Sequence, residues 1–344
     1  MNNKLSASTI IICGIVRDCG KNLEKNIRTV ASLCAMAKDY RVVIFENDSK
    51  DNSKQILQRW ADSDSKVFVS LNDFGTITIP PKTDEVIPAF STARIGKMAN
   101  YRNFYLDYIE QNNLEGDYVV IVDFDIRKID IKGIINSFSL NYEWDAITAN
   151  GISYAPSAFF RRRFYDTYAF VECGRENIPQ TEENIKAAQY RWAFLKAGMP
   201  PIRVASAFGG LAIYRREAIE ECRYKVLLNN DEKVESRAEH YFFHRQMAER
   251  GYDKIFVNPS MTVYYQTQVW NTIKKYHNSL IINKLVWGGV IHILLNNQGF
   301  TLVLLTLNIR DDVSSTNVFL CHNIVNSQIK FERVDSTYNQ FLAA

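Results

Sequence analysis

The chain of 344 residues is 47% hydrophobic and 23% charged, the composition of a globular protein large enough for one α/β domain with or without an appendage. Its net charge of +3 is too small to indicate a nucleic-acid-binding protein, although a mild basic excess suits a phosphate-bearing ligand or an anionic membrane surface. The six cysteines form neither a C-x-x-C pair nor a zinc-binding spacing, which predicts reduced thiols and a cytoplasmic protein.

The first half of the chain alternates apolar runs with helical periodicity. Continuous apolar runs predict strands at 9–16, 40–45, 66–71 and 118–122. Apolar residues at helical spacing predict helices at 23–34, near 56–60 and at 92–111, and a long proline-containing loop at 72–91. This β-α-β-α-β-loop-α-β order predicts a doubly wound, Rossmann-like α/β sheet.

The second half continues with a helix at 131–139, a strand at 144–149 and an aromatic, arginine-rich loop at 150–175. A strand-like stretch at 203–214 contains Gly209-Gly210, which indicates a close approach of backbone or a bulge. We expect a helix at 235–250 and strands at 254–258, stopped by Pro259, and at 263–265.

The last part of the chain differs in character. Residues 271–344 contain an apolar stretch at 280–295 that is broken by polar residues, and strand-like runs at 301–307 and 317–321. We therefore predict a main domain at 1–270 and a C-terminal extension at 271–344 that packs on it, with peripheral contact to the inner face of a membrane as the less favoured role. The N-terminal apolar run is too short for a signal peptide, and no run of about 18 apolar residues predicts a spanning helix.

Charged side chains follow three of the predicted strands at their carboxyl ends. Arg17 follows the first strand, Glu46 and Asp48 follow the second, and Asp123 and Asp125 follow the strand at 118–122. Ligands of such sheets bind beyond the carboxyl ends of the strands, so these side chains are expected to share one site. The paired carboxylates repel each other, and a hard divalent ion, Mn²⁺ or Mg²⁺, relieves that repulsion. The plainer interpretation is a strand that ends in solvated acids.

Other motifs narrow the class of ligand. The chain has neither G-x-G-x-x-G nor G-x-x-x-x-G-K-[ST], which argues against a dinucleotide dehydrogenase and a P-loop NTPase. The stretch Tyr154–Tyr168 combines aromatics, which suit sugar faces, with arginines, which suit phosphates. Glu239 stands at the start of a helix, as a general base or as a carboxylate favoured by the helix dipole. His240 and His244 are four residues apart and are able to share a metal, although a core or surface role is preferred for His244.

These motifs together resemble glycosyltransferases of the nucleotide-diphospho-sugar (GT-A) fold. The segments that carry the resemblance are Val42–Asp51, Arg94–Asn103, the D-x-D at 123–125, Phe208–Ala212 and Glu239-His240. A Tyr165-Asp166 pair and the G-x-x-x-I-x-V-x-P pattern at 251–259 resemble more closely the fungal capsule-associated mannosyltransferase family and its bacterial relatives. The resemblance covers roughly residues 9–265 and departs at His240, where the fungal proteins are expected to carry tryptophan.

The resemblance implies a GT-A fold with a mixed, mostly parallel sheet, and transfer of a hexose, mannose among the candidates, from a nucleotide-diphosphate donor to a hydroxyl of a glycan or lipid-linked acceptor in surface or capsule polysaccharide synthesis. It assigns Asp123, Asp125 and His240 to Mn²⁺ or Mg²⁺, with His244 and His277 as further candidates for the third ligand. The donor-binding set that it implies is Arg17, Glu46, Asp48, Arg94, Arg102, Asp123 and Phe124. Glu239 and Asp166 are the catalytic candidates: Glu239 is the base if the anomeric centre inverts and an orienting group if it is retained, and Asp166 lies with the acceptor-side stretch.

Two other classes remain open from the sequence. One is a sugar- or nucleotide-binding scaffold without catalysis, which the intact acids disfavour. The other is a metal-dependent nucleotidyltransferase or phosphohydrolase, disfavoured by the missing glycine loop and by the scarcity of clustered metal ligands.

Overall fold

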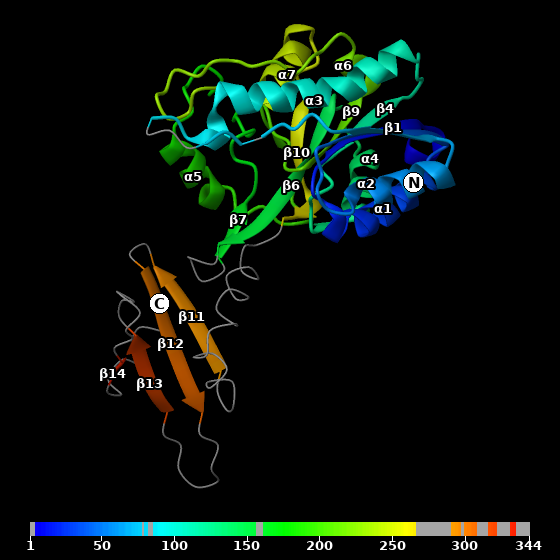
Figure 1. Cartoon of the computed structure of the whole chain (residues 1–344). Coiled ribbons are helices and arrows are strands. Elements are labelled where there is room, and N and C mark those ends of the chain that lie inside the picture. The colour runs from blue at the N-terminus through cyan, green and yellow to red at the C-terminus, as the bar shows by residue number, and fades with distance from the viewer. Residues whose placement is uncertain are drawn as a thin grey trace. The chain divides into compact units, whose positions relative to one another are not determined.

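A computed structural model describes residues 4–77, 79–81, 85–155 and 161–265, together with four strands between residues 290 and 334 (Figure 1). The chain divides into two compact units. The first comprises Met1–Ser153 and Arg163–Gln266, and the second comprises Tyr154–Arg162 and Thr267–Ala344. The predicted division into 1–270 and 271–344 stays a prediction.

One large mixed sheet forms the centre of the first unit. In spatial order its strands are β3 (Val67–Asn72), β2 (Asp39–Asn47), β1 (Thr9–Val16), β4 (Tyr118–Val122), β9 (Leu211–Arg215), β6 (Ala146–Ala155), β10 (Ile255–Tyr264) and β5 (Lys128–Ile129). The short strands β7 (Arg161–Phe164) and β8 (Ile202–Arg203) pair with β6 and β10. β3, β2, β1 and β4 run parallel, as do β6 and β10, and β9 is inserted antiparallel between β4 and β6.

Helices cover both faces of this sheet, as Figure 1 shows. On one face α1 (Gly20–Cys34), α2 (Ser53–Ser63) and α4 (Ile131–Phe138) contribute to one apolar core, and on the other α3 (Thr92–Gln111), α6 (Arg216–Ile219) and α7 (Glu239–Glu249) contribute to a second. The remaining helices are η1 (Lys4–Ala7), η2 (Pro88–Phe90) and α5 (Glu182–Arg191). The predicted mixed α/β sheet flanked by helices is confirmed.

Three predicted elements have the expected bounds, namely β1, α3 and β4. Two others were predicted wrongly. Pro259 does not stop the strand at 254–258, because β10 continues through it, with a register shift between Asn258 and Thr262 that accommodates the missing amide hydrogen. The helix predicted from Glu235 begins only at Glu239, because the backbone of residues 235–237 bonds to other loops, as when Asn229 N donates to Glu235 O at 3.0 Å.

The region predicted as one long loop from 150 to 175 contains regular structure. β6 extends to Ala155, and β7 follows at Arg161–Phe164. Pairing with β10 and β9 supports β6 over residues that carry no alternating pattern of their own. Strand formation here depends on tertiary pairing rather than on local sequence.

The second unit contains a four-stranded antiparallel sheet in the order β11 (Val290–Asn296), β12 (Gly299–Leu307), β13 (Thr316–Cys321) and β14 (Phe331–Val334). The strands predicted at 301–307 and 317–321 are confirmed as β12 and β13. No helix in the described part of the chain is long and apolar enough to cross a bilayer.

Candidate active site

A cavity of about 450 Å³ lies at the carboxyl ends of β1 and β4 in the first unit, and we call it the central cavity. Its volume is that of a typical small-molecule site. It is lined by residues 15–17, 19, 47, 89–90, 94, 98, 101–102, 123, 125, 153, 163–169, 185, 189, 208 and 238–240. Because β1, β2 and β4 are parallel neighbours, the side chains that follow them meet at this edge of the sheet.

The D-x-D segment leaves β4 with its two acids directed into the central cavity. Asp123 N donates to Gly210 O at 2.9 Å, and the Asn26 side-chain amide donates to the carbonyls of Phe124 and Ile126 at 3.0 and 2.7 Å, which fixes the turn. Asp123 and Asp125 line the cavity, whereas Phe124 between them is fully buried in the opposite core. The prediction that Phe124 binds the donor is therefore not supported, because its ring is buried in the apolar core and does not line the cavity.

A buried arginine joins two of the predicted acids. Arg102 lies on the cavity side of α3, where its Nη2 is 3.2 Å from Asp123 Oδ1 and its Nε is 2.9 Å from Glu239 Oε1. The ring of Phe208 covers the guanidinium at 4.9 Å. Burial lowers the pKa of Arg102, but Asp123 and the other groups around it more than compensate, so the guanidinium stays charged. Arg102 therefore holds both carboxylates in place.

The remaining carboxyl groups of the cavity resist ionisation. Its enclosed position and the neighbouring Asp123 raise the pKa of Asp125 to about 7. Burial, with further repulsion from Asp123 and Glu239, also raises the pKa of Asp166 to about 7. Burial likewise raises the pKa of Asp123, against the opposing effect of Arg102. Of these four acids, only Asp123 and Glu239 pair with an arginine among the described residues, so the repulsion at Asp125 and Asp166 is not relieved by an ion pair.

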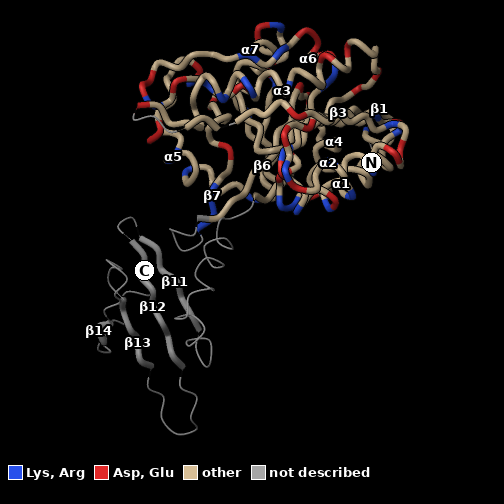
Figure 2. The backbone as a smooth tube through the Cα atoms, viewed as in Figure 1, with Lys and Arg blue, Asp and Glu red and all other residues tan. Residues whose placement is uncertain are grey.

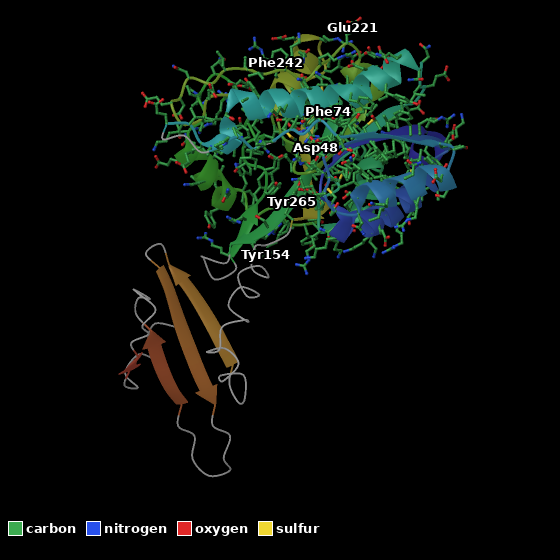
Figure 3. All side chains as sticks on the ribbon, viewed as in Figure 1. Asp48, Phe74, Tyr154, Glu221, Phe242 and Tyr265 are labelled. Carbon is green, nitrogen blue, oxygen red and sulfur yellow. The ribbon has the colours of Figure 1, made fainter. Side chains whose placement is uncertain are left out.

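The polar residues after β1 and β2 divide into two groups. Arg17 and Asn47 line the central cavity, and Arg17 Nη2 donates to Thr76 O at 2.9 Å. Asp48, labelled in Figure 3, follows β2. Its carboxylate accepts from the amide and the hydroxyl of Thr76 at 3.2 and 2.6 Å. Burial acts to raise the pKa of Asp48, but its hydrogen bonds together have the larger effect and lower the pKa below its usual value. The carboxylate is therefore ionised.

Glu46 is not placed as predicted. Its carboxylate is fully buried and accepts from the amides of Ser49 and Asn72 at 2.8 and 3.3 Å, so it closes the turn after β2 instead of lining the central cavity. Among the described residues, Asp48 also stands behind the cavity wall and positions Arg17 at 3.8 Å. Both acids therefore support the predicted donor-binding edge from behind.

The two histidines of α7 have different surroundings. His244 is a core residue, with Nδ1 2.9 Å from Ser206 Oγ and Nε2 2.9 Å from the Tyr214 hydroxyl. Its ring nitrogens are both occupied, so it is no metal ligand. His240 lines the central cavity, stacks on Phe208 at 3.9 Å and is neutral, since burial and Arg102 lower its pKa well below the usual value.

The metal set predicted from the sequence is not assembled in full. Within the described residues, no three His, Cys, Asp or Glu side chains are grouped closely enough to hold a metal ion, so His240 does not join Asp123 and Asp125. Its Nε2 instead lies 3.8 Å from Glu239 Oε1. His277 lies outside the described residues.

Cavity-lining residues on α3 follow helical spacing. Arg94, Met98, Tyr101 and Arg102 are related as i, i+4, i+7 and i+8, so they share one face. The helix begins at Thr92 after Ser91, whose Oγ accepts from Arg94 N at 3.3 Å. This N-cap fixes Arg94 in the first turn of the helix. Arg94 and Arg102, both predicted to contact the donor, therefore line the central cavity from α3.

Some of the cavity-lining residues were not predicted from the sequence. Gln189 lies on α5, a helix that was not predicted, although Thr181 with Glu182 and Glu183 is a recognisable helix start. Arg163 lies in the aromatic, arginine-rich stretch that was predicted to contact the acceptor, and it lines the central cavity together with Tyr165, Asp166 and Tyr168. Predicted donor-side and acceptor-side residues therefore meet in one cavity.

The family is shown by comparison with known proteins. Residues 9–246 match the family model described as Cryptococcal mannosyltransferase 1. The protein is therefore a glycosyltransferase by class. The chain belongs to the Cryptococcal mannosyltransferase 1 family, which confirms the family predicted from the sequence. No curated protein matches the chain.

Similarity to solved structures is low. The mannosyltransferase PcManGT from Pyrobaculum calidifontis, in complex with GDP-Man and Mn²⁺, is 13% identical with a TM-score of 0.41, over 82% of this chain and 65% of that chain. S. aureus TarS with UDP-GlcNAc is 14% identical with a TM-score of 0.41, over 75% of this chain and 58% of that chain. Glucosyl-3-phosphoglycerate synthase from Mycobacterium tuberculosis is 11% identical with a TM-score of 0.37, over 89% of this chain and 90% of that chain. The chain thus spans less than two thirds of the first two structures.

Proposed function

We propose that the protein transfers a hexose, with mannose the first candidate, from a nucleoside-diphosphate donor to a hydroxyl of a glycan or lipid-linked acceptor in surface polysaccharide synthesis. The observation that carries this proposal is the position of Asp123 and Asp125. They leave the end of β4 into the central cavity beside Arg17, which follows the parallel neighbour β1. A nucleotide at the ends of β1 and β2 would place its diphosphate at this carboxylate pair.

The carboxylate pair fits a divalent ion. Mg²⁺ and Mn²⁺ are commonly held by one or two carboxylates, with substrate phosphates and water completing the shell, so a third protein ligand is not required. The pKa of Asp125 is raised to about 7 in a cavity where Asp123 already repels it, which is the situation that a cation relieves. When bound, such an ion neutralises the charge that develops on the departing nucleoside diphosphate.

The chain's own residues orient the two substrates. Arg17 and Asn47 line the nucleoside end of the cavity, and Tyr101 lies on the adjacent face of α3. Arg102 fixes Asp123 and Glu239 through its two ion pairs. The aromatic side chains of Phe90, Tyr165 and Tyr168 line the other end, where apolar faces suit sugar rings.

We assign the general base to Asp166. In the transfer step the acceptor oxygen bonds to the anomeric carbon, the bond from that carbon to the diphosphate oxygen breaks, and the hydroxyl proton passes to the Asp166 carboxylate. A base with a pKa near the working pH is the most effective, and that of Asp166 is raised to about 7. One of its oxygens accepts from Gly209 N at 3.1 Å, which orients the carboxylate. Glu239 is assigned to positioning, because Arg102 occupies its Oε1.

A thermal-shift screen tests the proposal. Native protein is titrated with GDP-mannose, UDP-glucose and UDP-N-acetylglucosamine, each with Mn²⁺ and with EDTA. One donor is expected to raise the melting temperature only with Mn²⁺, since a ligand that binds the native state stabilises it. The proposal fails if no donor shifts the temperature, and binding without donor hydrolysis or transfer would instead favour the non-catalytic scaffold.

A further inference from the structure

Two of the arginines that line the central cavity, Arg94 and Arg163, differ from the others in their ion pairs. Arg17 pairs with Asp48, and Arg102 pairs with Asp123 and Glu239. Arg94 and Arg163, in contrast, form no ion pair with any carboxylate in the described part of the chain. Each makes one hydrogen bond through Nη1, to Ala89 O at 3.1 Å and to Gln189 Oε1 at 3.4 Å.

Both guanidinium groups keep a buried donor unused. The Nε atoms of Arg94 and Arg163 are shielded from solvent and have no hydrogen-bond partner among the described residues. Burying a polar group without a partner costs free energy, so such donors in a cavity wall indicate the place of a ligand acceptor atom. A charged guanidinium with free donors is best matched by an oxyanion, which it binds through paired hydrogen bonds.

Neither arginine lies on β1, β2 or β4, the parallel strands whose carboxyl ends meet at the carboxylate pair. Arg94 precedes Arg102 by eight residues on α3, which is about 12 Å at a rise of 1.5 Å per residue. Arg163 lies on β7, which pairs with β6 beyond the residues Ala146–Thr148 that pair with β9.

The wall near these arginines is aromatic. The rings of Phe90 and Tyr168 pack at 4.6 Å, and the Tyr168 hydroxyl donates to Ser236 O at 2.6 Å, which fixes that wall. Arg94 lines the same cavity as Tyr165 and Tyr168. Burial raises the pKa of both tyrosines, and the positive charge of Arg94 opposes this rise at both hydroxyls. An apolar face with two free cations suits a sugar that carries a negative charge.

We propose that Arg94 and Arg163 form an anion subsite for the acceptor, so that the protein prefers an acceptor carrying an oxyanion close to the attacked hydroxyl. The oxyanion is either the phosphate of a lipid-linked sugar or the carboxylate of an acidic sugar, since both offer paired oxygens to a guanidinium. This inference rests on the proposed function only in naming the ligand an acceptor; the anion subsite itself rests on the two unpaired arginines.

Equilibrium binding to the full chain tests the subsite. The protein is first saturated with Mn²⁺ and the nucleoside diphosphate selected by the donor screen, which fills the donor site. Mannose 6-phosphate, glucuronic acid and neutral mannose are then titrated by calorimetry. At least one anionic probe is expected to bind about tenfold or more tightly than mannose, the value of a charged hydrogen bond. Preference for the phosphate identifies a phosphate-linked acceptor, and preference for glucuronic acid an acidic sugar.

Variants assign the preference to residues. Arg163→Gln and Arg94→Gln are each expected to weaken binding of the anionic probe about tenfold, which brings its affinity close to that of mannose. Nucleoside diphosphate should still bind to both variants. Arg163→Lys keeps the positive charge and is expected to retain part of the preference for the anionic probe. The matched control is Arg59→Gln, which removes an arginine paired with Glu24 on the surface of α2 and is expected to leave the preference unchanged.

The outcomes separate the subsite from the proposed function. Equal binding of all three probes, or a preference that survives in both glutamine variants, overturns the subsite. Loss of nucleoside diphosphate binding in these variants also overturns it, because the arginines then belong to the donor. If no nucleoside diphosphate binds but an anion preference that depends on Arg94 and Arg163 persists, the subsite stands and the glycosyl-transfer function fails.

Discussion

Replacement of Asp166 by asparagine separates the cost of its buried charge from its catalytic role. Asp166 has a left-handed backbone, with φ of 64°, a conformation that asparagine also tolerates. The asparagine amide oxygen is able to accept from Gly209 N as the carboxylate does. The substitution therefore removes a proton-binding group with little change in shape.

The magnitude follows from the pKa of Asp166, which is raised from 3.8 to about 7. The folded protein holds this proton more tightly than the unfolded chain, so the contribution of Asp166 to stability is fully present below pH 4 and is lost as the pH rises through 7. A shift of about three units corresponds to roughly 4 kcal/mol, and shared repulsion with Asp123 reduces this to about 2–4 kcal/mol. Asp166→Asn should recover that amount at pH 8 and little at pH 4.

The assay is thermal unfolding of metal-free protein at pH 4 and pH 8, together with glycosyl transfer. At about 2 °C per kcal/mol, the variant should melt about 4–8 °C above wild type at pH 8. Transfer should fall by about 100-fold or more while donor binding persists. The control is Asp18→Asn, a second aspartate with positive φ, of 49°, whose side chain is 49% exposed and stays hydrated. A variant that is no more stable than wild type at pH 8, or that transfers sugar at the normal rate, refutes the reasoning.

Three further predictions concern the framework around the cavity. Glu239→Ala leaves Arg102 buried with one partner fewer and should lower the free energy of unfolding by about 3–5 kcal/mol in a denaturant titration; a loss below about 1 kcal/mol would show that the pair is not buried in solution. Glu239→Gln should reduce turnover less than Asp166→Asn does, and the reverse order in a steady-state assay would return the base to Glu239. Gly210→Ala should lower the melting temperature well beyond Gly75→Ala, because a Cβ on Gly210, with φ of 89°, would lie only 2.1 Å from the Tyr265 hydroxyl, whereas Gly75, with φ of 63°, has open space around it. Equal melting temperatures of the two variants would contradict the predicted clash.

The elements predicted most accurately are those whose signal is local. β1 and β4 are continuous apolar runs, and α3 has a serine cap and a regular stripe of cavity and core residues. The Arg17, Asp123 and Asp125 cluster followed from parallel strand order alone. Strand β7 and helix α5 were missed, because their side chains follow neither helical nor strand alternation strongly enough.

The direction of individual side chains was predicted less well. Glu46 ends β2 in the expected place but turns inward to cap the next turn, and sequence does not distinguish a carboxylate that faces a cavity from one that bonds a buried backbone. His240 was expected at the metal, yet stacking on Phe208 fixes its ring near Glu239. Such placements depend on packing between elements far apart in the chain.

Figure 2 shows basic and acidic residues interspersed along the described backbone of the first unit. No large region of one sign is evident among them in that view. Tyr265, labelled in Figure 3, stacks on Tyr165 at 3.4 Å, behind the cavity wall that carries Asp166.

Release of nucleoside diphosphate from the selected donor, measured for wild type and Asp125→Asn with Mn²⁺ and with EDTA, tests the central claim most directly. Asparagine retains the shape of Asp125 but removes half of the charge that is proposed to hold the ion. Wild type with Mn²⁺ should release nucleoside diphosphate and transfer sugar, and the variant or EDTA should abolish both while the folded state persists. Full release by Asp125→Asn, or undiminished release in excess EDTA, would contradict a metal-assisted sugar transfer at the Asp123–Asp125 pair.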